Sequence, residues 1–432
     1  MKFIKFNFLA CLGLLATLCG MPEKSEAIIA SVKSTGMGQA AIAYPQDSLA
    51  VAFNPAAMIA VGRRVDGEIY WAHDRGRATV SNNKFPIPPP PFPQINGTFN
   101  VMRTHDVYGA NFGFNTCFCS QLGCWNFEWS FGSALYNRDF QKTTFNKIQP
   151  LFGTSKPGIE ALHEEIDTSL AIRIWDGHTL GVSVDWHIFR VKVNGLQNFD
   201  NPMFSSHPGH VTNRGYNYSQ GVGVTVGYYG QLCDWLAIGA TYRPKTRMKR
   251  FTKYDGFFAQ HGRIDIPEKI GAGIAFTFSP CWALAFDYEH FRWHQIKALS
   301  NKILPAILTE LLGTDEGVGF GWRNQNKYRV GINYFLNDCL TLRAGFVHVQ
   351  TPTPRSQLAT NVLLDDLVQD YLTVGFTWYF SCCMEFSGFF AHGFKHTLKK
   401  KGAIPVPIFG GGDIKLSEGS KNALGFALGW CW

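Results

Sequence analysis

The chain has 432 residues, of which 15% are aromatic and only 17% charged, and 44 of them are glycine. A soluble domain typically carries about 25% charged residues, whereas membrane β-barrels are rich in aromatic and small residues. After the N-terminal 27 residues no stretch reaches the roughly 18 apolar residues that a spanning helix needs, which excludes a helical inner-membrane protein. The formal charge of +8 would suit nucleic acid, but the export signal described next argues against that partner.

The N-terminus has the features of a secretory signal peptide. Two early lysines precede an apolar run, Phe8–Leu18, and Ser25-Glu26-Ala27 supplies small residues for a cleavage site. We therefore expect residues 1–27 to be removed after export. A lipoprotein anchor is the alternative, but Cys11 lies too early and a bulky leucine precedes Cys19.

The segment that follows, Ile28–Val61, does not alternate as a strand would. It is rich in glycine and alanine, and its only charged residues are Lys33 and Asp47. A segment this apolar needs cover, so we expect residues 28–63 to pack inside a barrel as a plug. Residues 64–432 would then form the barrel.

The C-terminal strand shows the strand pattern most clearly. Its large side chains occupy every second position and small residues lie between them, which places the two kinds on opposite faces. The chain ends on an aromatic residue, as in the signal read by the barrel-assembly machinery. Similar alternation occurs in Tyr328–Tyr334 and Leu372–Phe380. The large residues of the last strand are Leu424, Phe426, Leu428, Trp430 and Trp432.

Short and long connections alternate along the chain. This is the hairpin rhythm of an outer-membrane barrel, with tight periplasmic turns and long outer loops, and it predicts about fourteen antiparallel strands. The short turns lie near Cys117–Cys124, Asp176-Gly177, Gln231–Asp234, Ser279–Cys281, Asn337–Cys339 and Ser381–Cys383, and the long connections near Ser81–Asn100, Gln141–Leu162, Leu196–Thr212, Thr252–Gly262, Lys297–Gly319, Thr351–Leu367 and Thr397–Gly419.

Two of the long connections have a distinctive composition. Phe85–Pro93 must be extended polyproline, either as a rigid outer loop or as a segment that docks a partner. Ile296–Leu312 is apolar enough for short helices broken at Pro305. Its leucines and isoleucines either pack on neighbouring loops or form an apolar landing surface.

The order of residues in the N-terminal segment resembles the hatch of the FadL family of long-chain fatty acid transporters. Three later hairpin stretches are similar to that family too: Trp235–Thr246, Ile266–Phe278 and Asn337–Thr353. The hatch residues and the LTLRAG stretch are the most specific. The hatch residues are Gly36-Met37-Gly38, Ala40-Ala41, Ala43, Asp47-Ser48 and Asn54-Pro55-Ala56.

The resemblance implies a fourteen-stranded barrel closed by its hatch, which takes up long-chain fatty acids or aromatic hydrocarbons. In the family a kink in the third strand opens a lateral exit to the membrane. The third strand here is expected at Trp125–Thr143. The kink region of the family carries a glycine, whereas the matching stretch here is Leu135–Asp139, with Asn137 at its centre. Because asparagine tolerates unusual backbone angles, we expect the kink at Asn137.

A fatty acid ligand would need a cation in the lumen. By alternation, four basic side chains fall on the face opposite the lipid-facing residues, together with Asp287 and Glu289. They either brace the barrel through ion pairs with carboxylates, or one lacks a partner and receives the carboxylate of the ligand, bidentately if it is arginine. The four are Arg243, Lys269, Arg329 and Arg343.

The sequence does not indicate an enzyme or a cofactor. Ser183, Asp185 and His187 alternate along one strand, so they point in parallel and cannot converge as a catalytic triad does. The chain also lacks a G-x-S-x-G nucleophile elbow.

Nine cysteines follow the signal peptide, all at expected short turns or at the C-terminal end. We expect them on the periplasmic rim, where an oxidising environment and an odd number favour disulfides within the barrel and to other envelope proteins. Zinc is the alternative, but the spacing is irregular and the turns lack histidine, so no metal is predicted. The cysteines are Cys117, Cys119, Cys124, Cys233, Cys281, Cys339, Cys382, Cys383 and Cys431.

Together these features predict a bacterial outer-membrane channel for long-chain fatty acids or other hydrophobic molecules. Diffusion would drive uptake, and rearrangement of the hatch around Asn54-Pro55-Ala56, with Gly36 and Gly38 as further hatch residues, would gate it. The alternative is a structural or adhesive barrel linked by disulfides. The proline-rich loop and the cysteines favour that alternative, whereas the apolar hatch and the apolar loop favour transport.

Overall fold

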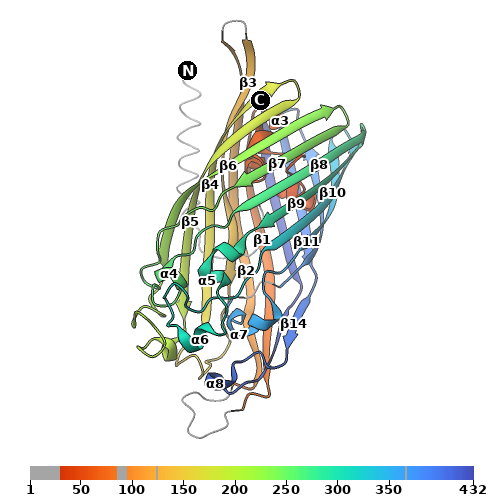
Figure 1. The fold of residues 1–432 in the computed structure, drawn as a ribbon. Helices are drawn as coiled ribbons and strands as arrows, with labels where there is room; N and C mark the ends of the chain where they lie inside the picture. Colours follow the sequence, from red (N-terminus) through yellow and green to blue (C-terminus); the bar gives the residue numbers. More distant parts are fainter. Residues whose placement is uncertain (1–29, 85–94, 123–124, 365–366) are drawn as a thin grey trace.

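The computed structural model describes residues 30–84, 95–122, 125–364 and 367–432, and its strands form one antiparallel sheet that closes on itself (Figure 1). Strand β1 pairs with both β2 and β16, which completes a barrel of fourteen strands. Within the described residues, no helix is long and apolar enough to cross a membrane. The barrel strands are β1 (Arg64–Ser81), β2 (Gly97–Leu122), β3 (Trp125–Lys142), β4 (Gly158–Trp175), β5 (His178–Asn194), β6 (Asn217–Cys233), β7 (Leu236–Arg243), β8 (Lys269–Ser279), β9 (Trp282–Phe291), β10 (Gln325–Asn337), β11 (Leu340–Val349), β12 (Asp370–Tyr379), β13 (Met384–Gly393) and β16 (Lys421–Cys431).

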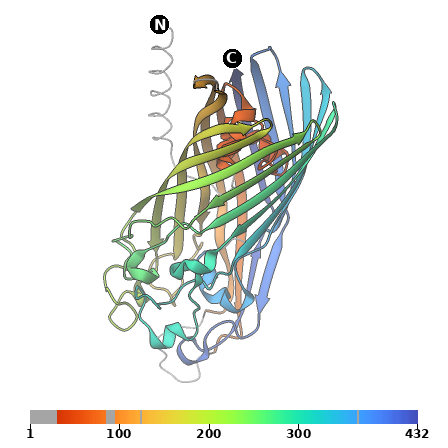
Figure 2. The same cartoon turned by 45° about the horizontal axis from the view of Figure 1, so that its top comes forward.

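The two ends of the barrel differ as the hairpin rhythm predicts. The short turns and the C-terminus lie at one end, and the long loops with their short helices lie at the other (Figures 1 and 2). In an outer-membrane barrel the short turns face the periplasm. The outer loops contain η3 (Gln197–Phe199), α4 (Ala259–Gly262), η4 (Trp293–Gln295), α5 (Lys297–Ser300), α6 (Ala306–Thr309), η5 (Arg355–Gln357), α7 (Leu358–Asn361) and α8 (Val406–Phe409).

The last long connection contains a hairpin that the sequence pattern did not predict. It consists of β14 (His396–Lys400) and β15 (Asp413–Glu418), and β15 pairs with the outer end of β1. β14 carries three basic residues within its five, so it lacks the apolar alternation of a membrane-facing strand. Pairing with the overhanging part of β1 stabilises it instead, through backbone hydrogen bonds that do not depend on side chains.

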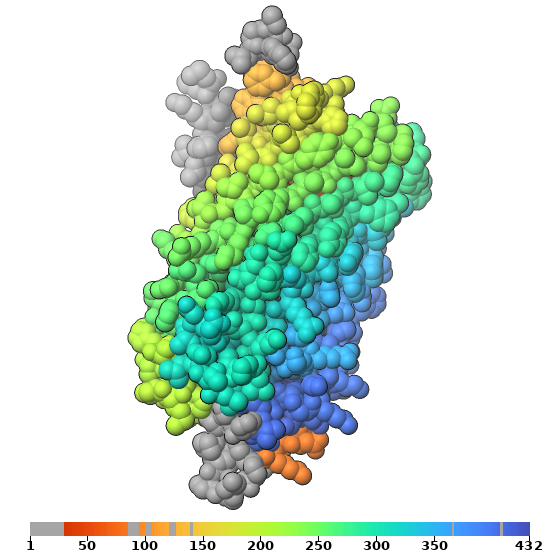
Figure 3. Space-filling model, viewed as in Figure 1, coloured from red at the N-terminus to blue at the C-terminus, as the bar shows by residue number. Residues whose placement is uncertain are grey.

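The two faces of the wall alternate residue by residue. In β5 the outward Leu180, Val184 and Trp186 are exposed, whereas the inward Ser183 and Asp185 are buried. β16 follows the same rule, with exposed leucines and aromatic residues facing out. Figure 3 shows the strands as oblique bands around the barrel. The apolar face therefore meets lipid, and the polar face lies in the lumen.

The N-terminal segment, residues 30–62, lies inside the barrel near the end with the short turns (Figure 1). Its elements are short and capped by side chains: Ser31 caps α2 (Val32–Gly36), Asp47 caps η1 (Ser48–Ala52), and Asn54 caps η2 (Pro55–Ala57), which continues into α3 (Met58–Val61). Such caps satisfy amide groups that a short helix leaves without partners. Packing against the wall, rather than helical propensity, holds these elements.

Glycines in the wall make room for this segment. A Cβ atom at Gly331 would lie 2.0 Å from the carbonyl oxygen of Met37, and one at Gly345 would lie 2.2 Å from the amide nitrogen of Gly38. Gly38 itself has a φ of +65°, a conformation that favours glycine. The high glycine content therefore has a local cause, because the backbone of the segment touches the backbone of the wall.

The outer loops pack over the mouth of the barrel. In the loop Ile296–Leu312, Ile303 and Leu312 are buried among neighbouring loops, whereas Leu304 and Leu308 are exposed by 43% and 50%. Helix α5 ends before Pro305 and helix α6 begins directly after it, as expected. The predicted signal peptide, the proline-rich Phe85–Pro93 and Cys124 lie outside the described residues.

Candidate ligand-binding lumen

A cavity of about 250 Å³ lies in the lumen between the N-terminal segment and the outer loops. Ala30, Ala52 and Phe53 form part of its boundary on the side of the N-terminal segment. Three of the four predicted cations, Arg243, Lys269 and Arg329, line it. Its apolar lining includes Ile159, Phe189, Val191, Phe258, Ile264, Leu299, Phe320, Trp322, Val347 and Leu364.

Buried ion pairs surround this cavity, and cations outnumber carboxylates in them. Arg329 and Lys269 approach Glu289 at 2.6 and 3.6 Å. Arg138 and Arg243 approach Glu165 at 2.6 and 3.4 Å. Glu289 and Glu165 thus each have two cations beside them, while Asp167 and Asp185 cluster with Glu165 and Asp287 interacts with Arg329.

Arg329 is the cation best placed to bind an anionic group. One of its terminal nitrogens contacts Glu289, while Nε and the other terminal nitrogen have no hydrogen-bond partner among the described residues. Its guanidinium also lies 5.9 Å from the centre of the Phe53 ring. Buried donors without partners are costly, so a carboxylate that reached this guanidinium would gain charge-assisted hydrogen bonds.

Arg343 has a different environment and is not among the residues that line the cavity. Its side chain donates to Gln46 Oε1 at 2.6 Å and to Thr377 Oγ1 at 2.7 Å. Burial raises the pKa of Tyr44 in the same region to about 12, although Arg343 acts in the opposite direction. Arg343 therefore holds the N-terminal segment against the wall.

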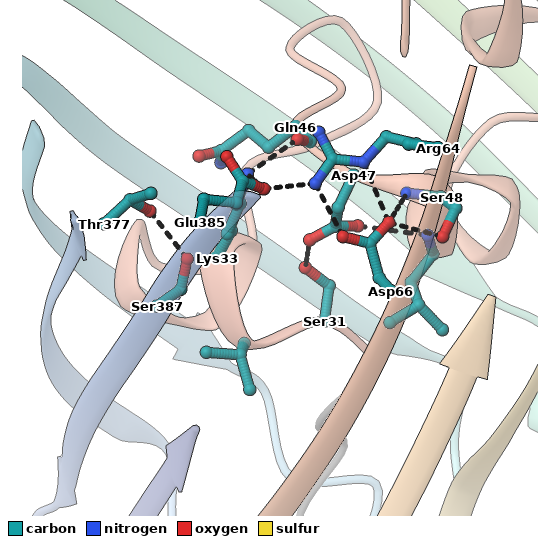
Figure 4. Close-up of polar contacts among 12 residues, drawn as sticks. Ser31, Lys33, Gln46, Asp47, Ser48, Arg64, Asp66, Thr377, Glu385 and Ser387 are labelled. Atoms are coloured by element: carbon teal, nitrogen blue, oxygen red, sulfur yellow. Dashed lines mark hydrogen bonds and ion pairs between the residues drawn. The ribbon is translucent and has the colours of Figure 1, made fainter. Parts of the chain in front are cut away.

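A network of charged side chains completes that attachment (Figure 4). Arg64 of β1 donates twice to Asp66 and once to Glu385 of β13, and Lys33 also pairs with Glu385. Ser48 donates to Asp66 through its amide, at 2.8 Å, and through its hydroxyl. Burial and the neighbouring Asp66 raise the pKa of Asp47 to about 6. Side chains of the segment and of the wall thus satisfy each other away from water.

The Asn54-Pro55-Ala56 turn touches the opposite side of the barrel. Asn54 donates to the carbonyl oxygens of Ile42 and Tyr228, both at 2.9 Å, and accepts from the amide of Ala56 at 3.1 Å. A Cβ at Gly181 would lie 2.4 Å from the Ala56 amide nitrogen. Gly36 is equally close to the wall, because a Cβ there would lie 2.9 Å from the Cα of Gly375. These residues fix the segment on both sides of the lumen.

A second, more apolar cavity of about 120 Å³ lies beneath the outer loops. Phe258 and Phe320 line both cavities, so the two spaces are neighbours. The second is lined by phenylalanine, leucine and isoleucine side chains from several loops. An apolar molecule that entered there would meet a hydrophobic surface throughout.

The wall pairing is interrupted beside Asn137. The pairing of β2 with β3 runs from the facing residues Phe112 and Leu135 to the periplasmic end. On the outer side of these two residues, the two strands are not joined by ladder hydrogen bonds. The register between β3 and β4 also shifts after Asn137, and the side chain of Asn137 donates to the hydroxyl of Tyr70 at 3.0 Å. The neighbouring Tyr136 and Arg138 line the larger cavity. The interruption therefore lies beside the ligand space.

The described cysteines are free thiols and lie near the periplasmic end. The sulfur atoms of Cys382 and Cys383 lie 3.4 Å apart. Cys117 and Cys119 lie on the β2–β3 hairpin, opposite Ser130 and Glu128. The others are Cys233, Cys281, Cys339 and Cys431.

The polar residues considered for catalysis do not assemble into a triad. Ser183 donates to Asp185, whereas His187 approaches Glu165 and His163 on the neighbouring strand. These contacts brace the inner face of β4 and β5.

Two residues at the cavity were not singled out from the sequence. Arg138 could have been found by extending the alternation of Ser130, Ala134 and Tyr136 by one step, although the irregular register there weakens that signal. Phe53 offered no such signal, because its contact with Arg329 joins the N-terminal segment to a strand far along the chain.

Fold and lumen together define an outer-membrane β-barrel channel for hydrophobic compounds. Residues 25–401 match the family model described as outer membrane protein transport protein (OMPP1/FadL/TodX). The chain belongs to this family, whose members are transport channels of the bacterial outer membrane. The resemblance to the FadL family expected from the sequence is thereby confirmed.

Solved structures have the same fold at low sequence identity. A FadL homologue from Pseudomonas aeruginosa aligns with a TM-score of 0.67 and 16% identity, over 93% of this chain and 98% of that one. The toluene transporter TodX of P. putida gives 0.63 and 14%, over 95% and 99%. The toluene transporter TbuX of Ralstonia pickettii gives 0.57 and 15%, over 93% and 98%. A comparison with curated proteins finds no match.

Proposed function

We propose that this channel takes up long-chain fatty acids by diffusion and that residues 28–63 act as its hatch. The observation that carries the proposal is the mainly apolar cavity whose lining includes more lysines and arginines than carboxylates, with Arg329 having donors to spare. An apolar tail would gain from burial there, and a carboxylate would find its counter-charge. A neutral aromatic hydrocarbon would gain only from burial of its apolar surface, because it has no carboxylate.

The route begins at the smaller cavity under the outer loops and continues past Phe258 and Phe320 into the larger one. The ligand carboxylate binds Arg329, with Arg243 and Lys269 contributing to the positive field. Because Arg329 also lies against Phe53, a bound carboxylate competes for the contact that links the wall to the segment. A ligand can shift a conformational equilibrium only through such differential contacts.

Two exits are available to the ligand. Displacement of the Asn54-Pro55-Ala56 turn and of the Gly36–Gly38 contacts would open the lumen toward the periplasm. The interrupted pairing beside Asn137 would instead release the ligand sideways into membrane lipid. The lateral exit suits a ligand that prefers lipid to water, and it leaves the extensive contacts of the segment in place.

Further partners follow from the location. Outer-membrane lipids cover the apolar face, and the barrel-assembly machinery would recognise the C-terminal strand. The rim thiols could join neighbouring envelope proteins through disulfides. Membership of a transport family does not favour the structural or adhesive barrel considered as the alternative.

Uptake in a strain that lacks its own fatty acid transporter tests the substrate class. Expression of this chain should restore entry of radiolabelled oleate and should raise toluene entry less. A matched strain with the empty vector, and surface detection of the barrel, control for background and assembly. Restoration of toluene entry alone would contradict the fatty acid assignment while keeping the channel.

Deletion of residues 28–61 tests the hatch. The deletion would remove the polar network and the glycine contacts that fill the periplasmic half, so ion conductance through single barrels in planar bilayers should rise several-fold. Heat-modifiable migration on gels would verify that the barrel has folded. Unchanged conductance in a folded barrel would show that the segment is not a plug.

A further inference from the structure

Two outer loops meet through two histidines and a carboxylate. His207 and His210 belong to the loop between β5 and β6, and Asp255 belongs to the loop between β7 and β8. The Nδ1 atoms of the histidines lie 2.9 and 3.0 Å from the same oxygen of Asp255. Their rings stack 3.7 Å apart with an interplanar angle of 12°. The three ligand atoms lie within 4.8 Å of one another.

Two tautomeric states suit these distances. Neutral imidazoles that carry Nδ1–H would donate to Asp255, and His210 would share its proton with the carbonyl oxygen of Thr252 at 2.8 Å. With the proton on Nε2 instead, both Nδ1 lone pairs and the Asp255 oxygen converge on one point, where a divalent cation would replace the two protons and neutralise the carboxylate. Imidazole and carboxylate are the donors that Zn²⁺ takes, commonly with water in a fourth position.

The loops hold these residues in place before any ion binds. Ser205 donates to the carbonyl oxygen of Gly256 at 2.8 Å, and the amide of Gly256 donates to the carbonyl oxygen of His210 at 3.2 Å. Gly209 has a φ of +85°, which lets the chain turn between the two histidines. The side chains remain accessible, with exposures of 51% for His207 and 25% for both His210 and Asp255. A preorganised, solvent-accessible set of ligands costs little to occupy.

The other histidine cluster with a carboxylate suits a metal less well. His163, Glu165 and His187 lie together in the lumen. Arg138 already pairs with the same Glu165 oxygen that faces the histidines, at 2.6 Å. A metal ion there would compete with a buried guanidinium, whereas Asp255 has only the two histidines as ion-pair partners among the described residues.

We propose that His207, His210 and Asp255 form a site for a divalent transition metal, with Zn²⁺ as its first candidate, on the outer face of the channel. The metal joins the two loops at the point where the chain continues into Phe257 and Phe258. Both phenylalanines line the apolar cavity under the loops, and Phe258 also lines the larger cavity. A bound metal therefore fixes the wall of the ligand entrance.

Zinc binding to the purified full-length mature barrel tests the site. The protein is prepared in detergent without a histidine tag, its thiols are alkylated so that the cysteines cannot bind metal, and it is stripped with EDTA. Titration with ZnCl₂ at pH 7.5, followed by metal analysis after desalting, should give one more zinc per barrel in the parent than in the His207→Ala/His210→Ala variant. Asp255→Asn should weaken binding at least tenfold.

His294→Ala is the matched control, because His294 is an exposed histidine on another outer loop, paired with Asn324 at 2.7 Å. Zinc should also slow tryptic cleavage near the exposed Lys249, Arg250 and Lys253 in the parent and in the control, but not in the double variant. Equal zinc content in parent and double variant would overturn the proposal. Loss of the bound zinc in the His187→Gln variant, rather than in the double variant, would also overturn the proposal.

Discussion

The periplasmic and outer halves of the lumen are closed in different ways. In the periplasmic half, residues 30–62 touch the wall backbone to backbone, and the buried ion pair of Lys33 with Glu385 of β13 holds them. In the outer half, loops pack apolar side chains over two cavities and leave space between them.

This difference separates closure from recognition. Glycine contacts and buried ion pairs are specific, so under the proposed function the periplasmic half would block passage. Apolar packing among loops is less directional and tolerates a guest, so the outer half can hold a ligand. Arg329 and Phe53 lie where the two halves meet.

The largest expected effect, on ion conductance, comes from forcing the N-terminal segment away from the barrel wall. Leucine at position 331 would place its Cβ 2.0 Å from the carbonyl oxygen of Met37, so Gly331→Leu should displace the segment. Single-barrel conductance should rise several-fold. Gly67→Leu is the control, because a Cβ at Gly67 meets nothing within 4 Å. A folded Gly331→Leu barrel with the parent's conductance would show that this contact does not close the channel.

A smaller effect should follow from joining β2 to β3 where their pairing stops. In a variant whose native cysteines are replaced by serine, Ala110→Cys on β2 and Asn137→Cys on β3 would form a disulfide on oxidation. This disulfide would join the two strands just beyond their last paired residues. Oleate uptake should fall on oxidation and recover with dithiothreitol, whereas oleate binding should persist. The pair Phe114→Cys/Ser133→Cys is the control, because those residues already face each other.

Uptake that is insensitive to the Ala110–Asn137 crosslink would exclude the lateral exit. The ligand would then have to pass the N-terminal segment, and closure would no longer be separate from the transport route.

The smallest effect concerns recognition alone. Arg329→Gln removes a charge from the cavity and should weaken oleate binding by about 10- to 100-fold, the range expected for hydrogen bonds to a charged group. Toluene binding should be unchanged. Arg343→Gln is the contrasting variant, since Arg343 contacts Gln46 and Thr377 rather than the cavity. Equilibrium binding of radiolabelled oleate measures both, and an equal loss in the two variants would contradict the role of Arg329.

Much of the barrel could be predicted from local pattern. Period-two alternation fixes which face of each strand is apolar, so the strands, their number and the inward direction of Arg243, Lys269, Arg329 and Arg343 follow from neighbouring residues. The hairpin β14–β15 was missed because its stability comes from pairing with the end of β1 rather than from its own composition.

The sequence by itself determined the membrane-facing strands, the alternating loops and an apolar N-terminal segment that needed cover, since each depends on residues close together in the chain. Only the tertiary structure decided which cation keeps donors to spare, that Arg343 holds the segment while Arg329 faces the cavity, and that two histidines meet Asp255. Those facts depend on side chains brought together from distant strands and loops, and no local periodicity encodes such distances.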